Sequence, residues 1–295
     1  MPEGDAIFRT ARTLNRALAG HEVVRFESVL PALTRIHADT PITGRTIESV
    51  TAAGKHVLMR FSALRQAQGA PGPSRDGGLV LRTHMRMNGS WHIYRPGERW
   101  QRPRRDMRVI VATKSFEAIG FNVPVAELLK PADVARQDDL RLMGPDLLGE
   151  ALDADEAVRR FREREALEIA DALLNQRIVA GAGNIYKSEV LFLCGVDPFA
   201  LVRDVGDDTL REILATARKH LIANVTDAPG GIITYRGYRR GAGRDVSEQR
   251  YVYGRAGKPC RRCGTPIRVK AQGPNARLTY WCPECQVRSS AYRGS

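Results

Sequence analysis

Four of the five cysteines stand in two close pairs near the C-terminus of the chain. Two residues separate Cys260 from Cys263 and Cys282 from Cys285, and eighteen residues lie between the pairs. Paired thiolates at this spacing are typical of a tetrahedral zinc site, in which two tight turns supply the sulfurs and the intervening segment forms a hairpin. Because four thiolates leave zinc no open position, the sequence predicts one structural Zn²⁺ in a zinc-ribbon β-hairpin.

The chain is strongly basic, and most of the excess charge lies at one end. Its 46 Lys and Arg outnumber 33 Asp and Glu, which gives a formal net charge of +13 at pH 7. Residues 232–295 contain 14 Lys and Arg against 3 Asp and Glu, and so carry +11 of that charge. This concentration indicates a polyanionic partner. Nucleic acid is favoured over a membrane surface, because the region has no long amphipathic helix pattern.

Apolar residues are plentiful but never continuous enough for a membrane span. They make up 43% of the chain, yet no run approaches the roughly 20 apolar residues that a span requires. Acidic residues also occupy the N-terminal stretch where a signal peptide would be apolar. We therefore expect a cytoplasmic protein with no membrane partner and with reduced cysteines, in which Cys194 is a small buried hydrophobe.

The local sequence pattern changes once along the chain, between about residues 131 and 145. A helical segment at 6–19 is followed, up to about residue 129, by short alternating or apolar runs separated by Gly, Pro and Asp. Such runs are typical of a β-sandwich or barrel, and 66–78 interrupts them with a polar, Gly- and Pro-rich insertion. Beyond residue 131 apolar residues recur at helical spacing. The sequence thus predicts an α+β multidomain protein, with an N-terminal β-sandwich led by a helix and then a helical domain.

The first three residues, Met1, Pro2 and Glu3, offer a nucleophile. Removal of Met1 would leave a secondary amine at Pro2 that ionises near neutral pH, unlike a lysine. Such an amine can form a Schiff base, and Glu3 beside it can act as a general acid or base. The alternative is an ordinary frayed terminus with no catalytic meaning.

A second candidate site is the turn AGAGNIYKSEVLF at residues 180–192. Its small residues allow a tight turn directly into a helix that begins at Asn184. Backbone N–H groups at such a helix start can hold a phosphate, aided by the helix dipole and the Asn side chain. The alternative is an interhelical turn with an Asn cap.

Five separated motifs occur in an order that identifies a family. They are MPEG at the start, GKHVL around Lys55, THMRMNGSW, AGAGNIYKSEVLF, and CRRCGTPI followed by WCPECQ. Over nearly its full length the chain resembles the formamidopyrimidine-DNA glycosylase and endonuclease VIII family, and within it the endonuclease VIII-like branch found in actinobacteria. The resemblance implies a helix–two-turn–helix in the helical domain. It implies three domains, with a catalytic β-sandwich at 1–131, the helix–two-turn–helix at 146–231, and a basic loop with a zinc finger at 232–295.

The resemblance also implies roles for three catalytic residues. Pro2 would attack C1′ of the damaged nucleotide and expel the base, and Glu3 would protonate the opening sugar and shuttle protons during β-elimination. Lys55 matches the family's hairpin lysine that binds the phosphate beside the lesion. The alternative for Lys55 is an ordinary exposed lysine.

Four further residues match the family's DNA contacts. His84 matches a phosphate contact, and Met87 lies where the family inserts an apolar wedge into the gap left by the everted nucleotide. The alternative for Met87 is a core residue on a strand. Asn184 would clamp a phosphate at the helix–two-turn–helix, and Arg277 matches the zinc-hairpin arginine that contacts phosphates flanking the lesion.

Two departures from the family pattern affect the active centre. Asp5 and Ala6 stand where many members have Pro followed by a second catalytic-site Glu, so that Asp5 would have to substitute from a shifted position. The segment 115–121 lacks the Arg-Arg-Phe pattern of the 8-oxoguanine branch, and 234–252 is shorter than that branch's lesion-capping loop. Both differences favour oxidised pyrimidines as substrates.

The resulting hypothesis is a bifunctional DNA glycosylase and abasic-site lyase of base excision repair, which cleaves by β- and δ-elimination through a Schiff base on Pro2. It would act as a monomer on damaged DNA, duplex or single-stranded, in the bacterial cytoplasm at the nucleoid. Two alternatives stay open at this point. A zinc-ribbon protein could recognise damaged or single-stranded DNA without cleaving it, and an RNA-binding translation accessory protein would also explain the charge and the ribbon.

Overall fold

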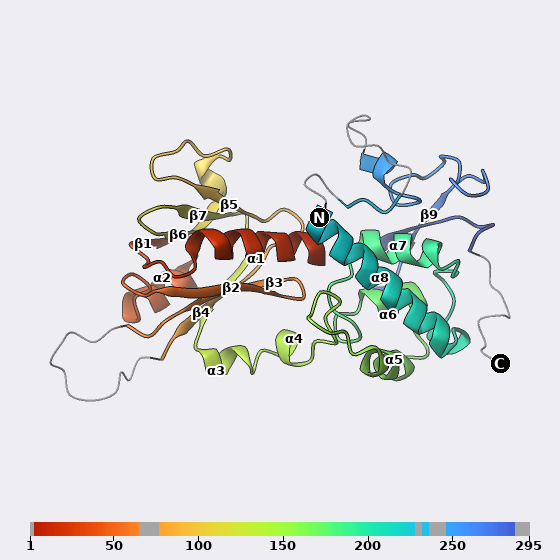
Figure 1. Ribbon diagram of the computed structural model, residues 1–295, viewed down its shortest axis with the longest axis horizontal. Helices are drawn as coiled ribbons and strands as arrows, with labels where there is room; N and C mark the ends of the chain where they lie inside the picture. The colour runs from red at the N-terminus through yellow and green to blue at the C-terminus, as the bar shows by residue number, and fades with distance from the viewer. Residues whose placement is uncertain (1–2, 65–76, 228–231, 236–245, 287–295) are drawn as a thin grey trace. The chain divides into compact units, whose positions relative to one another are not determined.

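The computed structural model describes residues 3–64, 77–227, 232–235 and 246–286 (Figure 1). These residues form two compact units, one spanning 6–141 and the other consisting of residues 3–5 together with the described residues from Leu142 onward. Among the described residues, no helix combines the length and the apolar character that crossing a membrane requires.

The first unit is a β-sandwich, as the sequence predicts. Its two antiparallel sheets contain four strands each. The strands of one sheet, in spatial order, are β1 (Arg25–Ser28), β6 (Met107–Ala112), β7 (Glu117–Phe121) and β5 (Ser90–Tyr94). Those of the other are β2 (Ile47–Ala53), β3 (His56–Phe61), β4 (Leu79–His84) and β8 (Val125–Leu129).

Helix α1 (Gly4–Leu18) leads the sandwich and contributes one face to its core. Ile7, Ala11, Leu14 and Leu18 recur every three or four residues, and all four are buried. This spacing places them along one side of a helix, where they pack with buried residues of both sheets. Gly20 follows with a positive φ of 82°, a conformation that suits glycine after a helix end.

One helix in this unit was not expected from the sequence. Residues Pro31–Asp39 form α2, although the sequence analysis interpreted the whole region up to residue 129 as β. Pro31 stands at the first helical position, where its fixed φ suits a helix and its missing N–H costs nothing. Leu33 is the one buried residue of α2, so the apolar periodicity that reveals a helix is weak here.

The chain leaves the sandwich through two short helices, α3 (Pro131–Val134) and α4 (Asp138–Arg141). The sequence predicts helix in this segment, and the structure divides it into two single turns. A 3₁₀ turn, η1 (Arg104–Asp106), lies earlier in the unit between β5 and β6.

The second unit is built on helices. These are α5 (Ala154–Arg162), α6 (Ile169–Leu174), α7 (Asn184–Leu193) and α8 (Asp207–Asp227), with 3₁₀ turns η2 (Val202–Asp204) and η3 (Val246–Gln249). Helix α7 begins at Asn184 as predicted, and its residues from Asn184 to Phe192 are all buried. Cys194, which follows α7, is half-buried against the helical core.

The C-terminal hairpin of this unit consists of β9 (Arg268–Gln272) and β10 (Arg277–Trp281). The strands are antiparallel, and Arg277 pairs with Gln272 next to the turn. Gly273 and Ala276 at the ends of that turn have positive φ angles of 69° and 48°. The predicted β-hairpin between the two cysteine pairs is confirmed.

Candidate functional site

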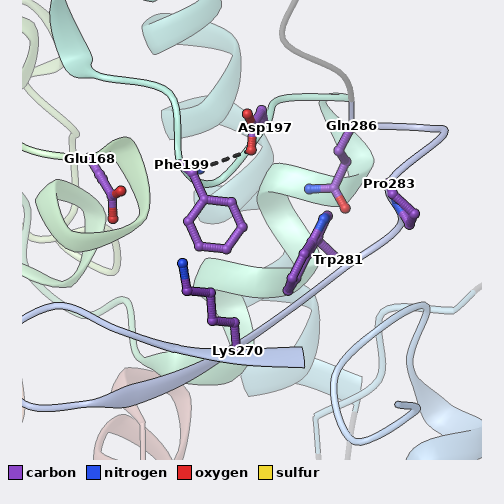
Figure 2. A pocket seen from close by; sticks show the side chains of 7 residues that line it. All are labelled: Glu168, Asp197, Phe199, Lys270, Trp281, Pro283 and Gln286. Atoms are coloured by element: carbon purple, nitrogen blue, oxygen red, sulfur yellow. Dashed lines mark hydrogen bonds between the residues drawn. The ribbon is translucent and has the colours of Figure 1, made fainter. Parts of the chain in front are cut away.

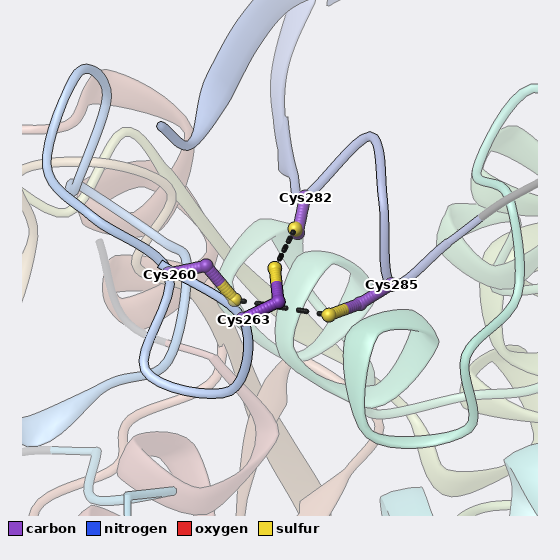
Figure 3. Close-up of side chains that lie close together, drawn as sticks. All are labelled: Cys260, Cys263, Cys282 and Cys285. Atoms are coloured by element: carbon purple, nitrogen blue, oxygen red, sulfur yellow. Dashed lines mark hydrogen bonds between the residues drawn. The ribbon is translucent and has the colours of Figure 1, made fainter. Parts of the chain in front are cut away.

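The four paired cysteines meet at the base of this hairpin (Figure 3). Their sulfur atoms all lie within 4.8 Å of one another, with 3.9 Å between those of Cys260 and Cys285 and 3.4 Å between those of Cys263 and Cys282. Zinc bound by four thiolates at about 2.3 Å requires sulfurs about 3.8 Å apart. The donor set and its spacing therefore fit one structural Zn²⁺.

The metal centre stabilises a small core of its own. Cys260 and Cys282 are buried in a cluster with Ile267, Val252 and Phe192, the last of which belongs to α7. A four-thiolate site therefore joins the hairpin to the C-terminal half of α7, and the metal supports structure rather than chemistry.

Glu3 is held at the opposite end of α7. Its side chain is fully buried, and its two carboxylate oxygens accept hydrogen bonds from the backbone N–H groups of Ile185, at 2.8 Å, and Tyr186, at 3.3 Å. A carboxylate is favoured there because a helix N-terminus carries partial positive charge and unpaired N–H donors. Glu3, which the sequence predicts to be a general acid or base, is thus held at the start of a buried helix.

The close approach of Glu3 depends on two glycines. A Cβ atom added to Gly183 would overlap the carboxyl group of Glu3, and one added to Gly4 would lie 2.7 Å from the carbonyl oxygen of Gly181. The N–H of Gly4 also donates to that carbonyl at 3.0 Å. The small residues of the turn therefore leave space for the N-terminal segment of the chain to pack against it.

This arrangement corrects one expectation. The sequence indicates that N–H groups at the start of α7 can hold a phosphate, but those of Ile185 and Tyr186 bind the protein's own Glu3. Asn184 is also engaged within the protein, since its side-chain N–H donates to the carbonyl oxygen of Leu278 in β10 at 2.9 Å. Asn184 is 7% exposed, and the role of its side chain in binding phosphate stays a prediction.

Two other N-terminal residues, Pro2 and Asp5, belong to the proposed active centre. Pro2 lies outside the described residues. Asp5 stands in the first turn of α1 with a fully buried side chain, and its substitution for the second family Glu stays a prediction.

Lys55 and His84 lie at the same end of the second sheet. Lys55 occupies the two-residue turn between β2 and β3, and His56 next to it pairs in register with His84. Burial lowers the pKa of His84, and the positive charge of Lys55 lowers it further. The Nδ1 atom of His84 accepts the backbone N–H of Arg86 at 3.1 Å, which leaves Nε2–H of the neutral ring as a donor suited to a phosphate oxygen.

A buried charged cluster near His84 was not predicted from the sequence. Arg82 on β4 is buried and forms ion pairs with Glu127 at 2.8 Å and with Asp139 at 2.5 Å. His56 contacts His84 edge to face, with ring centroids 4.7 Å apart, and burial together with His84 lowers the pKa of His56 to about 4. The sequence signal that could have revealed this cluster is the single arginine, Arg82, within the apolar strand LVLRTH.

Met87 is exposed in the turn between β4 and β5, with 57% of its surface accessible. It therefore does not belong to the core of a strand, which was the alternative for this residue. An exposed thioether in a turn has the shape and polarity required of a wedge, and its insertion into DNA stays a prediction.

Arg277 is exposed at the first position of β10, beside the hairpin turn. Exposure on the hairpin makes its guanidinium accessible to phosphate oxygens, the role that the resemblance implies.

Two buried charged residues of α7 were also missed. Lys187 and Glu189 are fully buried, and Glu189 accepts the backbone N–H groups of Tyr251, Val252 and Tyr253 at 2.7–2.8 Å and the hydroxyl of Thr234. Charged residues inside an otherwise apolar helical run were the signal that could have revealed them.

A pocket of about 490 Å³ opens on another part of the second unit (Figure 2). Phe199 and Trp281 contact edge to face across it, with centroids 4.9 Å apart, and the amine of Lys270 lies over the Phe199 ring at 5.4 Å. The remaining lining residues are Glu168, Asp197, Pro283 and Gln286. The pocket contains none of the predicted site residues, so it is separate from the candidate catalytic groups.

Three family models match successive parts of the chain. Residues 1–124 match the N-terminal domain of formamidopyrimidine-DNA glycosylase, residues 143–235 match the helix–two-turn–helix domain of the same enzyme, and residues 257–287 match a zinc finger found in that enzyme and in isoleucyl-tRNA synthetase. Together they account for both units and for the zinc site.

Two curated relatives match over nearly the whole length. The chain is 40% identical to a probable endonuclease 8 2 of Streptomyces coelicolor, over 97% of this chain and 94% of that protein. It is 34% identical to the DNA-(apurinic or apyrimidinic site) lyase Nei2 of Mycolicibacterium smegmatis, over 98% of this chain and all of that protein.

Among solved structures, a complex between the Lactococcus lactis glycosylase and DNA containing an abasic site has the same fold. Its TM-score is 0.76 at 23% sequence identity, and the match covers 97% of this chain and 99% of that one. The chain belongs to the formamidopyrimidine-DNA glycosylase and endonuclease VIII family of DNA-binding, zinc-containing repair enzymes.

Proposed function

We propose that this protein is a bifunctional DNA glycosylase and abasic-site lyase whose nucleophile is the amine of Pro2. The observation that carries the proposal is the fixed position of Glu3 at the start of α7, one residue from Pro2. A relative 34% identical over nearly the full length bears the name of an abasic-site lyase, which supports the same activity here.

The chemistry requires one proton to move between the two groups. Glu3 accepts one proton from the Pro2 ammonium, and the freed nitrogen attacks C1′ while the bond from C1′ to the base breaks. The base departs with the electron pair and takes up the second proton of the nitrogen. The C1′–O4′ bond then opens, O4′ receives the proton held by Glu3, and the nitrogen and C1′ form a Schiff base. Loss of protons from C2′ and then C4′ expels the 3′ and 5′ phosphates, and water releases Pro2.

An α-amino group suits this task because it titrates at a pH of about 8. A useful fraction is therefore unprotonated at neutral pH, whereas an ordinary lysine is almost fully charged. The helix start supports the other half of the step, since two N–H donors stabilise the anionic form of Glu3 between proton transfers.

DNA is proposed to be held by Lys55, His84, Asn184 and Arg277, with Met87 filling the gap left by the everted nucleotide. Lys55 and His84 support this assignment by their common position at one end of the sheet, and Met87 supports it by its exposure. The protein would act as a monomer on damaged DNA.

Oxidised pyrimidines are the proposed substrates. The segment 115–121 lacks the Arg-Arg-Phe pattern of the 8-oxoguanine branch, and within it Ile119 and Phe121 of β7 are buried in the sandwich. Most of the lesion-capping segment, residues 236–245, lies outside the described residues.

Borohydride trapping tests the proposal directly. The protein is incubated with oligonucleotides that contain an abasic site, an oxidised pyrimidine or 8-oxoguanine, and the reduced adduct is mapped by peptide sequencing. We expect an adduct on Pro2, a sharp loss of trapping in Pro2→Ala, and suppressed base removal in Glu3→Gln with better retained action on a preformed abasic site. An adduct on Lys55, or no adduct at all, would refute the mechanism.

The carboxylate position can be tested without changing Glu3. Gly183→Ala adds one methyl group where Glu3 lies and should reduce base removal at least about tenfold, because a small displacement of a catalytic group is costly. Gly77→Ala is the matched control, since a Cβ at Gly77 meets nothing within 4 Å. Equal rates in the two variants would show that the position of Glu3 does not matter.

A further inference from the structure

We propose that the loop between β5 and β6, residues 95–106, binds the phosphate backbone of DNA beside the lesion site. This segment is called the arginine loop below, because five of its twelve residues are arginine. The inference rests on the DNA-binding part of the proposed function and not on the chemistry of Pro2. It is carried by contacts of the first unit alone, which contains the whole loop (Figure 1).

The arginines of the loop are exposed and carry charge that the protein does not neutralise. All five are exposed, namely Arg95, Arg99, Arg102, Arg104 and Arg105. None of them forms an ion pair with a carboxylate of the described residues. By contrast, the exposed Arg136 pairs with Asp133 at 3.4 Å, and the exposed Arg141 pairs with Asp138 at 2.8 Å. Crowded guanidinium charges repel one another, and a bound polyanion would relieve that repulsion.

The acidic residues of the loop leave it with a net positive charge. Glu98 closes a turn, in which its carboxylate accepts the backbone N–H of Arg95 at 2.9 Å and its own N–H donates to the carbonyl of Arg95 at 3.0 Å. Gly97 in this turn has a positive φ of 80°. The one other acidic residue is Asp106. Five arginines against two carboxylates give the loop a formal charge of +3 within twelve residues.

An apolar anchor holds the loop on the outer face of the first sheet. Side chains alternate along β6, so that Val109 packs in the core between the sheets while Ile110 belongs to a separate cluster on the other face. Trp100 packs on that second cluster, with its ring 5.7 Å from the ring of Phe121. The arginines therefore extend from an anchored segment, and less conformational entropy is lost when they bind a ligand.

The loop returns to the end of the sandwich that carries the predicted DNA contacts. Ser90, the first residue of β5, and Met107, the first residue of β6, both pair with Phe121 of β7. The loop leaves β5 at its far end and so runs back along β7 to the end where Ser90 lies. Ser90 follows the turn that contains Met87, and β4 ends at His84 before the same turn. The last turn of the loop, η1, thus lies at the end of the unit where phosphates are proposed to bind.

The length of the loop suits several phosphates. It runs along the five residues of β7, which span about 16 Å at a rise of about 3.3 Å per residue. One strand of B-DNA presents a phosphate about every 3.4 Å along the helix axis, so a path of this length passes about five of them. Each planar guanidinium can bind a phosphate through two parallel hydrogen bonds. DNA is favoured over an acidic protein segment because the loop is continuous with the proposed DNA surface.

The salt dependence of DNA binding tests the proposal in the full-length, zinc-loaded protein. Affinity for an undamaged duplex of about 20 base pairs is measured between about 50 and 200 mM salt. The triple variant Arg99→Gln, Arg102→Gln, Arg105→Gln keeps the anchor Trp100 and also Arg104, whose guanidinium lies 5.4 Å from the Trp100 ring centroid. We expect its salt slope to flatten by about two to three units, since each phosphate contact contributes about 0.9.

The matched control removes the same charge from arginines that already have carboxylate partners. It is the triple variant Arg136→Gln, Arg141→Gln, Arg211→Gln, in which the third arginine pairs with Asp155 at 2.8 Å. Its slope should change by less than about one unit. If the arginine-loop variant changes the slope no more than this control does, the inference is overturned. Should the triple loop variant unfold more easily than wild type, each single loop substitution gives the same test at about one unit.

Failure of the inference and failure of the proposed function give different results. If wild-type protein forms the borohydride adduct but the loop and control variants have equal slopes, the inference fails and the proposed function stands. If wild-type protein forms no adduct while the slope flattens only in the loop variant, the proposed catalysis fails and the DNA contact stands.

Discussion

The basic residues before and within the first cysteine pair differ from those on the hairpin that follows. Arg255 donates to the backbone carbonyls of Tyr251 and Pro259 at 2.6 and 3.0 Å. Arg261 donates to the carbonyl of Arg250, pairs with Glu248 at 2.8 Å, and lies 3.9 Å from the ring centroid of Tyr235. By contrast, Arg268, Lys270 and Arg277 are exposed on β9 and β10.

The arginines before and within the first cysteine pair that bond within the protein form a first group, and Arg262 belongs to it although it is exposed. Its guanidinium donates to the carbonyls of Phe192 and Leu193 at 3.0 and 3.1 Å, and so caps the C-terminal end of α7. Net charge in a sequence therefore overstates the binding surface. Several arginines that the sequence assigns to a DNA partner fold the protein instead, and the hairpin residues are better placed for phosphates.

The largest effect on folding and DNA binding should come from removing the zinc. Both the arginines around the first cysteine pair and the exposed residues of the hairpin depend on it. Cys282→Ser should lose zinc and DNA binding, because a structural site of this kind is worth on the order of 10 kcal/mol of folding free energy. The first unit has its own core and should remain folded. Metal analysis, DNA binding and β-sheet circular dichroism measure the three quantities. Full DNA binding by a zinc-free variant would contradict the prediction.

A smaller effect is expected from an arginine of the first group. Arg261→Met removes a partly buried ion pair, two hydrogen bonds to backbone carbonyls and a cation–π contact. The free energy of unfolding should fall by about 2 kcal/mol, while the salt dependence of DNA binding should not change. Denaturant unfolding and binding titrations at several salt concentrations check both. A flatter salt dependence would contradict the structural role of Arg261, since it would make this residue a phosphate contact.

The smallest effect on stability is expected from the hairpin. Arg277→Ala should leave unfolding within about 0.5 kcal/mol, as for an ordinary surface position, and should flatten the salt slope of DNA binding by about one unit. The loss should be similar for damaged and undamaged DNA. Lys270→Ala is the matched control, because the Lys270 amine already lies over the ring of Phe199. If Lys270→Ala changes the salt slope of DNA binding as much as Arg277→Ala does, exposure alone decides which hairpin residues bind phosphate.

Much of the fold follows from short-range patterns in the sequence. The start of α7 at Asn184, the hairpin between the cysteine pairs and the periodic face of α1 depend on residues near one another along the chain. The same holds for the metal site, because the two cysteine pairs themselves specify the tight turns. Helix α2 was not predicted because its apolar periodicity is weak.

The site was less predictable, since its contacts join residues far apart in the chain. Glu3 binds N–H groups of residues 185 and 186, and Lys187 meets β10 more than ninety residues later. No local pattern reveals that a carboxylate will fill a helix start that equally suits a phosphate. The same reason explains why the cluster of Arg82, His56 and Asp139 was missed.

Helix α7, which is buried from Asn184 to Phe192, also bears on how the second unit opens. Its N–H groups and side chains hold Glu3 at one end, the zinc hairpin along one face and the backbone of residues 251–253 through Glu189. Fraying of a helix end is normally the easiest local fluctuation, but fraying here would strand several charged groups without partners. Amide hydrogens of α7 should therefore exchange with solvent only when the whole unit unfolds, which makes this helix the slowest-exchanging segment of the unit.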